Sequence, residues 1–376
     1  GSPLIFQRET LFQQASGVTY RIPALLYIPP TATFLAFAEK RSSAKDKDAK
    51  YLVLRRGCWH GSSIEWGPME ELSALVLPNH RTMNPCPLYD GTSGTIFLFC
   101  ICVKQGKTEQ CQIWRGRSAA RLCYTTSTNG GHSWTPLQDV TDKAIGTDLS
   151  RWATFAVGPG HGVQLDSGRL VVPAYTYYKH GCLCGVVPLP CSTRQHALIF
   201  YSDDGGHSWH KGALIGGEQT GECQVAEING SNAHRPLLYC NARARRGCRV
   251  IALSNDCGLQ FEHSAPCKVL AEPPQGCQGS VVSFTQPTGT GNTETWLLYS
   301  HPTDQHHRCD LGVYLNPSPP DEAGWRHLCM LHPGPAGYSD LAVCPNGVFG
   351  CLFECGTTHA CEEITFCLFT LKTSDS

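Results

Sequence analysis

A short turn-forming octet occurs three times along the chain. Ser202–Trp209 (SDDGGHSW) has a near copy at Ser127–Trp134 (STNGGHSW) and a degenerate third copy at Ser254–Phe261 (SNDCGLQF). The starts lie on average about 63.5 residues apart, which divides the 376 residues into about six units. Units of this length bury their hydrophobic faces by packing on neighbouring units. The spacing therefore predicts a repeat architecture.

The octet has the chemistry of a self-bonded turn. Ser and Asp side chains bond the backbone a few residues ahead, glycine supplies a positive φ, and the terminal Trp is an apolar plug. We therefore interpret the octet as structural. Asn129 can replace the Asp bond in the first copy, whereas Cys257, Gln260 and Phe261 predict a looser turn in the third.

Strand-like segments dominate the sequence. The chain contains 38 Gly and 25 Pro, which suits many short strands, and no long segment has helical periodicity. Strands are predicted at 197–201, 249–253, 295–299, 348–353 and 364–369. We predict an all-β fold, a six-bladed β-propeller with Asp-box turns, as a single domain over residues 1–376. A β-sandwich or a helical array fits the period less well.

Charge and cysteine usage exclude several functions. Thirty basic residues balance 31 acidic ones, so no attraction to nucleic acid is expected. The 16 His contain no HExxH pattern and the 22 Cys contain no CxxC pair, so no metal site is predicted. No signal peptide is recognised, and the chain can build its own core, so reduced thiols facing the cytosol are favoured over a disulfide framework.

Several charged residues follow or interrupt apolar segments. Arg21 precedes the apolar run 24–27, while Glu39 and Arg41 follow another at 34–38. Arg243, Arg308 and Glu354 end later strand-like segments. Taken singly, each arginine is best interpreted as a solvated surface residue.

Taken together, these segments resemble a known family. Tyr20-Arg-Ile-Pro23 followed by the Ser-x-Asp-x-Gly-x-Ser-Trp boxes is similar to the sialidases (exo-α-neuraminidases), and the resemblance runs essentially end to end. It is greatest to the vertebrate members that act on gangliosides at the plasma membrane, with the cytosolic members next. Supporting segments are 39–46, 80–87, 152–161, 276–280, 337–341 and 351–355. The resemblance implies a six-bladed propeller and a retaining hydrolase that removes terminal α-linked sialic acid.

The resemblance also implies how the substrate carboxylate is bound. Arg21, Arg243 and Arg308 would form a cage of permanently charged, forked donors around it. Glu354 would hold Arg21.

The resemblance assigns the catalytic roles to three further residues. Tyr338 would be the nucleophile, because a carboxylate nucleophile would be repelled by the substrate's own carboxylate. Glu222 would be its base, with Glu227 left open as a competitor, and the arginines are expected to favour the phenolate. Asp46 would be the general acid/base, although the run Lys45–Asp48 could equally be a solvated charged loop.

Further residues are implied as substrate-binding, and no cofactor is expected. Arg41 would contact the sugar and Glu109 would lie near its N-acetyl group; the remaining members of this set are Glu39, Met83, Tyr175, Tyr177 and Gln278. Tyr175 and Tyr177 could equally pack between blades.

The segment Gly181–Cys191 is apolar where a loop should be polar. It could pack on a blade, or it could touch lipid with Cys182, Cys184 and Cys191 S-acylated. The second interpretation predicts a peripheral plasma-membrane protein, with endosomal or lysosomal membrane as a further location and the cytoplasm as the alternative. An inactive sialic-acid-binding propeller and a protein-binding scaffold are the rival functions.

Overall fold

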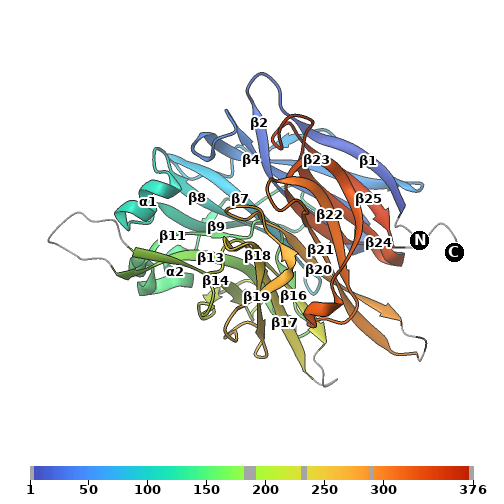
Figure 1. The fold of residues 1–376 in the computed structure, drawn as a ribbon. Coiled ribbons are helices and arrows are strands. Elements are labelled where there is room, and N and C mark those ends of the chain that lie inside the picture. Colours follow the sequence, from blue (N-terminus) through green and yellow to red (C-terminus); the bar gives the residue numbers. More distant parts are fainter. Residues whose placement is uncertain (1–3, 182–191, 230–234, 288, 290, 372–376) are drawn as a thin grey trace.

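Antiparallel sheets make up most of the chain. The computed structural model describes residues 4–181, 192–229, 235–287, 289 and 291–371. Its strands form five hydrogen-bonded sheets, which follow one another around the molecule (Figure 1). The five segments predicted as strands all lie within observed strands.

Four of the sheets have four or five strands each. The first contains β2 (Thr19–Ile28), β3 (Thr33–Arg41), β4 (Ala49–His60), β5 (Ser63–Trp66) and β6 (Glu70–Glu71). The second contains β7 (His80–Asp90), β8 (Thr95–Lys104), β9 (Ala120–Ser127) and β10 (Gln138–Asp139). The third contains β11 (Trp152–Val157), β12 (Val163–Gln164), β13 (Leu170–Gly181), β14 (Ser192–Ser202) and β15 (His210–Lys211). The fourth contains β16 (Cys223–Asn229), β17 (Pro236–Ala242), β18 (Cys248–Ser254) and β19 (Ala265–Ala271).

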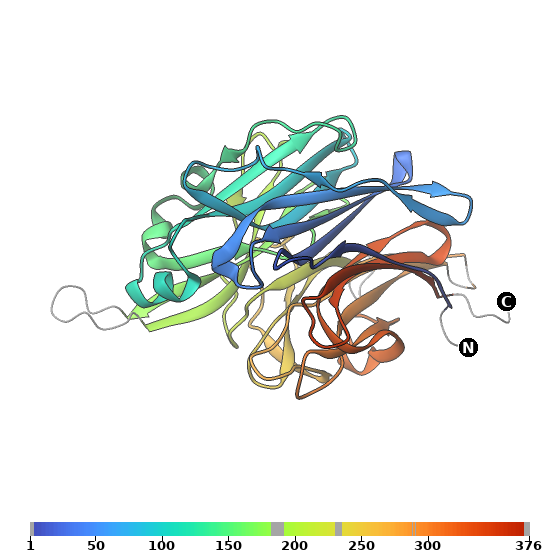
Figure 2. The same ribbon diagram turned by 90° about the horizontal axis from the view of Figure 1, so that it is seen from above.

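The fifth sheet has seven strands and brings together the two ends of the chain. Its members are β1 (Leu4–Gln13), β25 (Glu363–Thr370), β24 (Val348–Cys355), β23 (Arg326–Val343), β22 (Cys309–Asn316), β21 (Thr293–Pro302) and β20 (Ser280–Pro287). The long strand β23 pairs with β22 over 326–335 and with β24 over 336–343. Strands β1 and β25 lie side by side in both views (Figures 1 and 2).

Strands of neighbouring sheets contact one another in a closed circuit. β2 contacts β7, β7 contacts β11, β16 contacts β13 and β20, and β23 contacts β20 and β2. The arrangement is therefore all-β and propeller-like, as predicted. The continuous sheets number five and not the predicted six, because β23 extends through two successive groups of strands.

The three octets form the predicted self-bonded turns. In the second copy, Ser202 Oγ accepts a bond from the Gly206 amide (2.8 Å), and Asp204 accepts one from the Ser208 amide (2.9 Å). Trp209 is buried against Phe99 of the preceding sheet, with ring centroids 4.6 Å apart. The octet thus fastens one sheet to its neighbour.

The predicted loosening of the third octet holds for its side chains and not for its backbone. In the second copy Ser208 Oγ donates to Asp204 at 2.6 Å and Trp209 Nε1 donates to the Gly206 carbonyl at 3.2 Å, and the described residues of the third copy make no equivalent bonds. Ser254 Oγ nevertheless accepts the Gly258 amide at 2.8 Å and Asp256 accepts the Gln260 amide at 2.9 Å, as in the second copy. The backbone makes these bonds, and it needs only a residue that tolerates a left-handed turn. Cys257 adopts φ 58° there.

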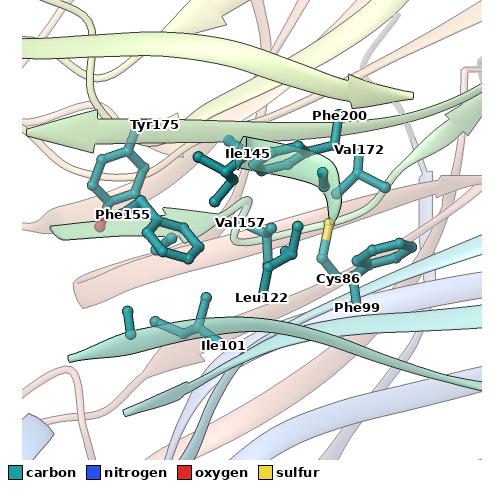
Figure 3. Packing of buried hydrophobic residues seen from close by; sticks show 14 of the residues in the cluster. Cys86, Phe99, Ile101, Leu122, Ile145, Phe155, Val157, Val172, Tyr175 and Phe200 are labelled. Atoms are coloured by element: carbon teal, nitrogen blue, oxygen red, sulfur yellow. The ribbon is translucent and has the colours of Figure 1, made fainter. Parts of the chain in front are cut away.

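The sheets are held together by apolar clusters between their faces. In the largest cluster, Phe99 and Leu122 of the second sheet face Val157 and Val172 of the third (Figure 3). Tyr175 and Phe155 lie at one end of this cluster (Figure 3). Core packing therefore continues up to the wall of the cavity described below.

Helices are short in the part of the chain that the structure describes. They are α1 (Glu109–Arg115), α2 (Thr141–Ile145) and 3₁₀ turns at Pro29–Thr31, Asp46–Asp48, Gly146–Arg151, Glu322–Gly324 and Pro345–Gly347. None of the described helices has the length and apolarity needed to cross a bilayer. The described cysteines are all free thiols. The apolar segment singled out in the sequence lies, apart from Gly181, outside the described residues.

Candidate active site

Three strands carry a register shift where they reach one end of the molecule's central axis. The shifts lie at Arg21–Ala24 in β2, Met83–Cys86 in β7 and Ala336–Ser339 in β23. A bulge bends its strand and re-aims the side chains around it. The three bulges therefore turn side chains from three parts of the chain toward one cavity.

Two buried carboxylates hold the backbone of these bulges. Glu354 accepts hydrogen bonds from the amides of Ile22 (3.1 Å) and Tyr338 (2.9 Å), and Glu39 accepts one from the Asn84 amide (2.7 Å). Ile22 has φ 66° and Asn84 has φ 56°, a region that non-glycine residues rarely adopt. The carboxylate bonds supply a reason for this strained backbone to persist.

Each of the same carboxylates also holds an arginine. Glu354 receives Arg21 Nε at 2.8 Å and Nη2 at 3.1 Å, whereas Glu39 receives Arg41 Nε at 2.9 Å and Nη2 at 2.7 Å. Burial disfavours the charged guanidinium of Arg21, but Glu354 outweighs this and raises the pKa of Arg21. Arg21 is thereby fixed as a cation in a buried position.

Tyr338 lies at the centre of the site. Its Oη is 2.8 Å from both carboxylate oxygens of Glu222, and Arg243 Nη1 donates to Glu222 (2.6 Å) and to Tyr338 Oη (3.0 Å). The guanidinium carbons of Arg21 and Arg308 lie 4.9 Å and 5.4 Å from the centroid of the Tyr338 ring. The three arginines predicted from the sequence therefore converge on one tyrosine.

The arginines favour the phenolate, as expected, but burial and the charge of Glu222 outweigh them. The pKa of Tyr338 is raised by these two effects, and Arg243, Arg308 and Arg21 offset the rise only in part. Tyr338 therefore carries its proton and donates it in a hydrogen bond to Glu222.

The geometry separates the two candidate bases. Glu222 directly precedes β16 and contacts Tyr338, whereas Glu227 lies further along the strand and accepts the Asp166 amide at 2.8 Å. Five strand residues span about 16 Å. Glu227 accordingly lines a different cavity, which also contains His161.

Asp46 lies at the rim of the site, on the 3₁₀ turn that follows β3. Its Oδ1 is 2.7 Å from Arg41 Nη1 and 3.8 Å from Arg21 Nη1, while its side chain remains 68% exposed. Burial by the surrounding walls would raise the pKa of Asp46, but Arg41 and Arg21 outweigh it and lower the pKa. Solvent screens these attractions. Asp46 is thus a solvent-accessible carboxylate that two arginines nevertheless hold in place.

A cavity of about 330 Å³ opens in front of these groups. Six arginines and three acidic residues line it, so its surplus charge is positive and suits an anionic ligand. The predicted site residues in its lining are Arg21, Arg41, Asp46, Met83, Glu109, Tyr175, Tyr177, Glu222, Arg243, Arg308 and Tyr338.

Three residues predicted to bind substrate lie behind the lining instead. Glu39 and Glu354 are buried against Arg41 and Arg21. Gln278 is buried too, and its amide nitrogen donates to the Ser339 carbonyl at 2.9 Å. These side chains position the residues of the site and do not face the cavity.

Tyr175 and Tyr177 were interpreted from the sequence either as substrate-binding residues or as residues that pack between blades, and their positions fit both interpretations. They are two residues apart on β13 and hence lie on one face of the sheet, where they are buried and also line the cavity. Tyr177 Oη accepts bonds from Arg245 Nη2 (3.2 Å) and from Gln195 Nε2.

Sequence reasoning missed several lining residues. Among them are Arg81, Gln112, Gln195 and Arg245. Arg81 falls within one of the family-like segments, and Arg245 is two residues from Arg243, so proximity to known motifs could have found both. Gln112 and Gln195 carry no such signal.

Glu109 is the first residue of α1 and faces the same cavity. Enclosure by the cavity walls, with added repulsion from Glu222 and Asp46, raises the pKa of Glu109 to about 7. The side chain is nevertheless solvent-exposed, so water weakens this effect. The cavity therefore holds an acid that can change its charge near neutral pH.

Groups of His, Cys, Asp and Glu with the geometry of a metal site do not occur among the described residues. The described cavity offers hydrogen-bond donors, carboxylates and a phenol. The chemistry available to these side chains is proton transfer and nucleophilic attack on a bound anionic molecule.

Comparison with known proteins identifies the class. Residues 32–351 match the family model of the BNR repeat-like domain. The structure superposes on the Hadza microbial sialidase Hz136 with a TM-score of 0.76 at 24% identity, covering 94% of this chain and 66% of that one. It superposes on the Trypanosoma rangeli sialidase with a TM-score of 0.67 at 16% identity, covering 96% and 59%. These likenesses establish a shared fold.

Curated relatives identify the family. The chain is 52% identical to Sialidase-3 of Homo sapiens over 96% of this chain and 91% of that protein. It is 45% identical to Sialidase-2 of Mus musculus (98% and 96%) and 39% identical to Sialidase-4 of Homo sapiens (99% and 94%). The chain belongs to the sialidase family and is a glycoside hydrolase that acts on sialic acid.

Proposed function

We propose that this protein is a retaining exo-sialidase that removes terminal α-linked sialic acid, with Tyr338 as nucleophile. The observation that carries the proposal is the contact of Tyr338 Oη with both Glu222 oxygens at 2.8 Å, surrounded by three arginines. A phenol is a weak nucleophile, and an adjacent base is the arrangement that activates it.

The arginines bind the substrate's carboxylate. Arg21, Arg243 and Arg308 present forked donors whose charge does not depend on pH, and Glu354 keeps Arg21 in place. The bound carboxylate lies beside the anomeric carbon, so a neutral phenol can approach where a carboxylate would be repelled.

The reaction proceeds in two displacements. In the first, Tyr338 Oη bonds to the anomeric carbon and passes its proton to Glu222, while Asp46 protonates the departing glycosidic oxygen. In the second, water loses a proton to Asp46 and attacks the same carbon, and the released tyrosinate recovers its proton from Glu222. Two inversions give net retention.

Replacement of Tyr338 by Phe tests the nucleophile. Tyr338→Phe should lower kcat for a fluorogenic sialoside by more than about a thousandfold. The free energy of unfolding should change by about 1 kcal/mol or less, because only a hydroxyl is removed. Tyr175→Phe, which removes a hydroxyl from the same cavity, is the matched control and should keep most of the activity.

A covalent adduct provides an independent readout. When wild-type protein is treated with 2,3-difluorosialic acid, the reagent should lose fluoride from C2, and the peptide that contains Tyr338 should gain the mass of one 3-fluorosialosyl group. An adduct on another residue, or wild-type turnover by Tyr338→Phe, would refute the assignment.

We further propose glycolipid, in particular ganglioside, as the preferred substrate, with the protein acting peripherally at a membrane. The motif resemblance to the sialidases that act on gangliosides and the apolar sequence segment 181–191 support this. The alternatives are a cytosolic enzyme of broader range and an inactive sialic-acid-binding propeller. Rates on a sialyl-glycolipid and a sialyl-glycoprotein, measured with wild-type protein and with Cys182, Cys184 and Cys191 replaced by Ser, distinguish them. Equal rates on both substrates and an unchanged membrane fraction would reject the proposal.

We also propose that the seven-stranded sheet counts as two blades divided within β23, which gives six blades in a single domain over residues 1–376. The change of partner from β22 to β24 between Pro335 and Ala336 supports this division.

A further inference from the structure

A second groove of about 560 Å³ adjoins the candidate active site. Gln195 and Arg245 line both spaces and bond the same Tyr177 hydroxyl. These two side chains therefore form the partition between the cavity and the groove. A molecule bound in the cavity can reach the groove by passing this partition.

The groove carries a surplus of positive charge. Its cations are Arg194 on β14, Arg245 and Arg246 on the turn between β17 and β18, and Lys268 on β19, whereas Glu218 is its single acidic residue. β14 belongs to the third sheet, whereas β17, β18 and β19 belong to the fourth, so only the fold brings these cations together.

The cations of the groove differ from those of the cavity in their pairing. Within the described ranges, Arg194, Arg245, Arg246 and Lys268 form no ion pair, although Arg245 donates to Tyr177. By contrast, Arg21, Arg41 and Arg243 each have a carboxylate partner. Unpaired cations in a concave surface attract anions, and forked guanidinium groups bind carboxylate or sulfate oxygens well.

We propose that this groove binds a second anionic group carried by the leaving part of the substrate. The proposal rests on the sialidase site described above: sialic acid occupies the cavity, and the adjoining sugars extend past Gln195 and Arg245. A carboxylate of another sialic acid or a sulfate ester has the required chemistry. The groove thereby gives the enzyme a preference for multiply charged glycans.

The test compares substrates that differ only in charge. The wild-type enzyme and the double variant Arg246→Gln/Lys268→Gln are assayed on a soluble sialyl-oligosaccharide and on the same oligosaccharide sulfated in its leaving part. A disialyl-oligosaccharide forms the carboxylate arm. Both substituted residues line the groove and not the cavity.

The double variant should lower kcat/KM for the sulfated and disialyl substrates about fivefold to tenfold, mainly through KM, because two exposed cations are lost. The value for the singly charged sialyl-oligosaccharide should stay within about twofold. In the wild type, the preference for the multiply charged substrates should decline as salt rises, and in the variant it should be small at all salt concentrations. Lys143→Gln/Arg326→Gln, which removes two exposed cations elsewhere, should leave every value unchanged.

Other outcomes would overturn the proposal. An equal loss on singly and multiply charged substrates would mean that the variant perturbs the catalytic cavity. Unchanged hydrolysis together with weaker binding to phosphatidylserine vesicles would assign the groove to a membrane surface. If the wild type did not hydrolyse even the singly charged sialyl-oligosaccharide, that result would refute the proposed function and would leave the groove's role in anion binding untouched.

Discussion

The inner end of the cavity, which we call its floor, and the rim differ in how far their charged groups are buried. On the floor, Arg21 is paired with the buried Glu354, and Tyr338 is bonded to the buried Glu222. At the rim, Asp46 sits on a 3₁₀ turn with 68% of its side chain exposed. On the proposed mechanism, the groups that hold the substrate and attack it are thus fixed in advance, whereas the proposed acid/base, Asp46, is left accessible to water.

The difference also concerns protonation. Burial and Glu222 keep the proton on Tyr338, while Arg41 and Arg21 lower the pKa of Asp46. On the proposed mechanism, both groups start the reaction in the less reactive form. A substrate carboxylate that engages the arginines and displaces water would raise the pKa of both groups. This shifts Asp46 toward its protonated, reactive form but disfavours the phenolate of Tyr338, so Tyr338 has to pass its proton to Glu222 as it attacks.

The largest effect should come from the floor. Glu354→Ala removes the two short bonds that hold the largely buried Arg21, leaves it only the exposed Asp46 at 3.8 Å, and removes the acceptor of two bulge amides. We expect a loss of about 3 kcal/mol in the free energy of unfolding and of more than about a hundredfold in kcat/KM. Urea denaturation and sialoside kinetics measure both.

The ion pair of Arg21 and Glu354 should also make the free energy of unfolding depend on pH. Burial would raise the pKa of Glu354, but Arg21 and the backbone bonds outweigh it and lower the pKa. The stability that ionised Glu354 contributes is therefore fully present when the pH is above the pKa of a glutamate in the unfolded chain. It is lost as the pH falls through the lower pKa that Glu354 has in the folded protein. Glu354→Gln, the isosteric control, should lose less stability between pH 5 and pH 3 than the wild type. A variant that stays as acid-sensitive as the wild type would contradict this assignment.

A smaller effect on stability and a selective effect on rate should come from the rim. Asp46→Asn should lower kcat about a hundredfold or more for a substrate with a poor leaving group and less for an activated aryl sialoside. Unfolding should change by less than about 0.5 kcal/mol, since the ion pair is exposed. Equal losses on the two substrates would argue against proton transfer by Asp46.

The smallest effect should be a change in the pH profile. Because the pKa of Glu109 is raised to about 7, its negative charge grows as the pH rises from 6 to 8 and opposes binding of the substrate carboxylate. The raised pKa also means that the folded state loses stability as the pH rises from about 4.5 to about 7, because the unfolded chain releases this proton first. In the wild type we expect KM to increase between pH 6 and pH 8, and Glu109→Gln should reduce this increase by a few fold. If the variant showed the same increase in KM as the wild type, another group would be responsible for it.

Local sequence predicted the scaffold well. The bonds of Ser202 and Asp204 link residues within four positions, so the octet specifies its turn without help from distant residues. In the third octet the sequence showed the loss of side-chain bonds but not that the bonds of the Gly258 and Gln260 amides would persist, because these do not depend on the residues that differ. The number of continuous sheets was not predictable, since only strand pairing shows that β23 serves two partners.

The site was predictable in its members and not in its geometry. Family resemblance supplied Arg21, Tyr338 and Glu222. Whether Glu222 or Glu227 contacts Tyr338 depends on where β16 begins relative to the cavity, which the length of a strand could have suggested. That Glu39 and Gln278 stand behind the lining depended on the bulges, which leave no clear mark in the sequence.

The sequence by itself determined the turns, the strands and the kinds of side chain available, because these depend on residues close together in the chain. The tertiary structure alone decided which side chains meet, which are buried and which charges are paired. Arg21 and Glu354 are 333 positions apart, yet they share hydrogen bonds of 2.8 and 3.1 Å. Protonation at Tyr338 and Asp46 follows from such contacts, since burial and neighbouring charge set a pKa and both arise only when the sheets close around a common axis.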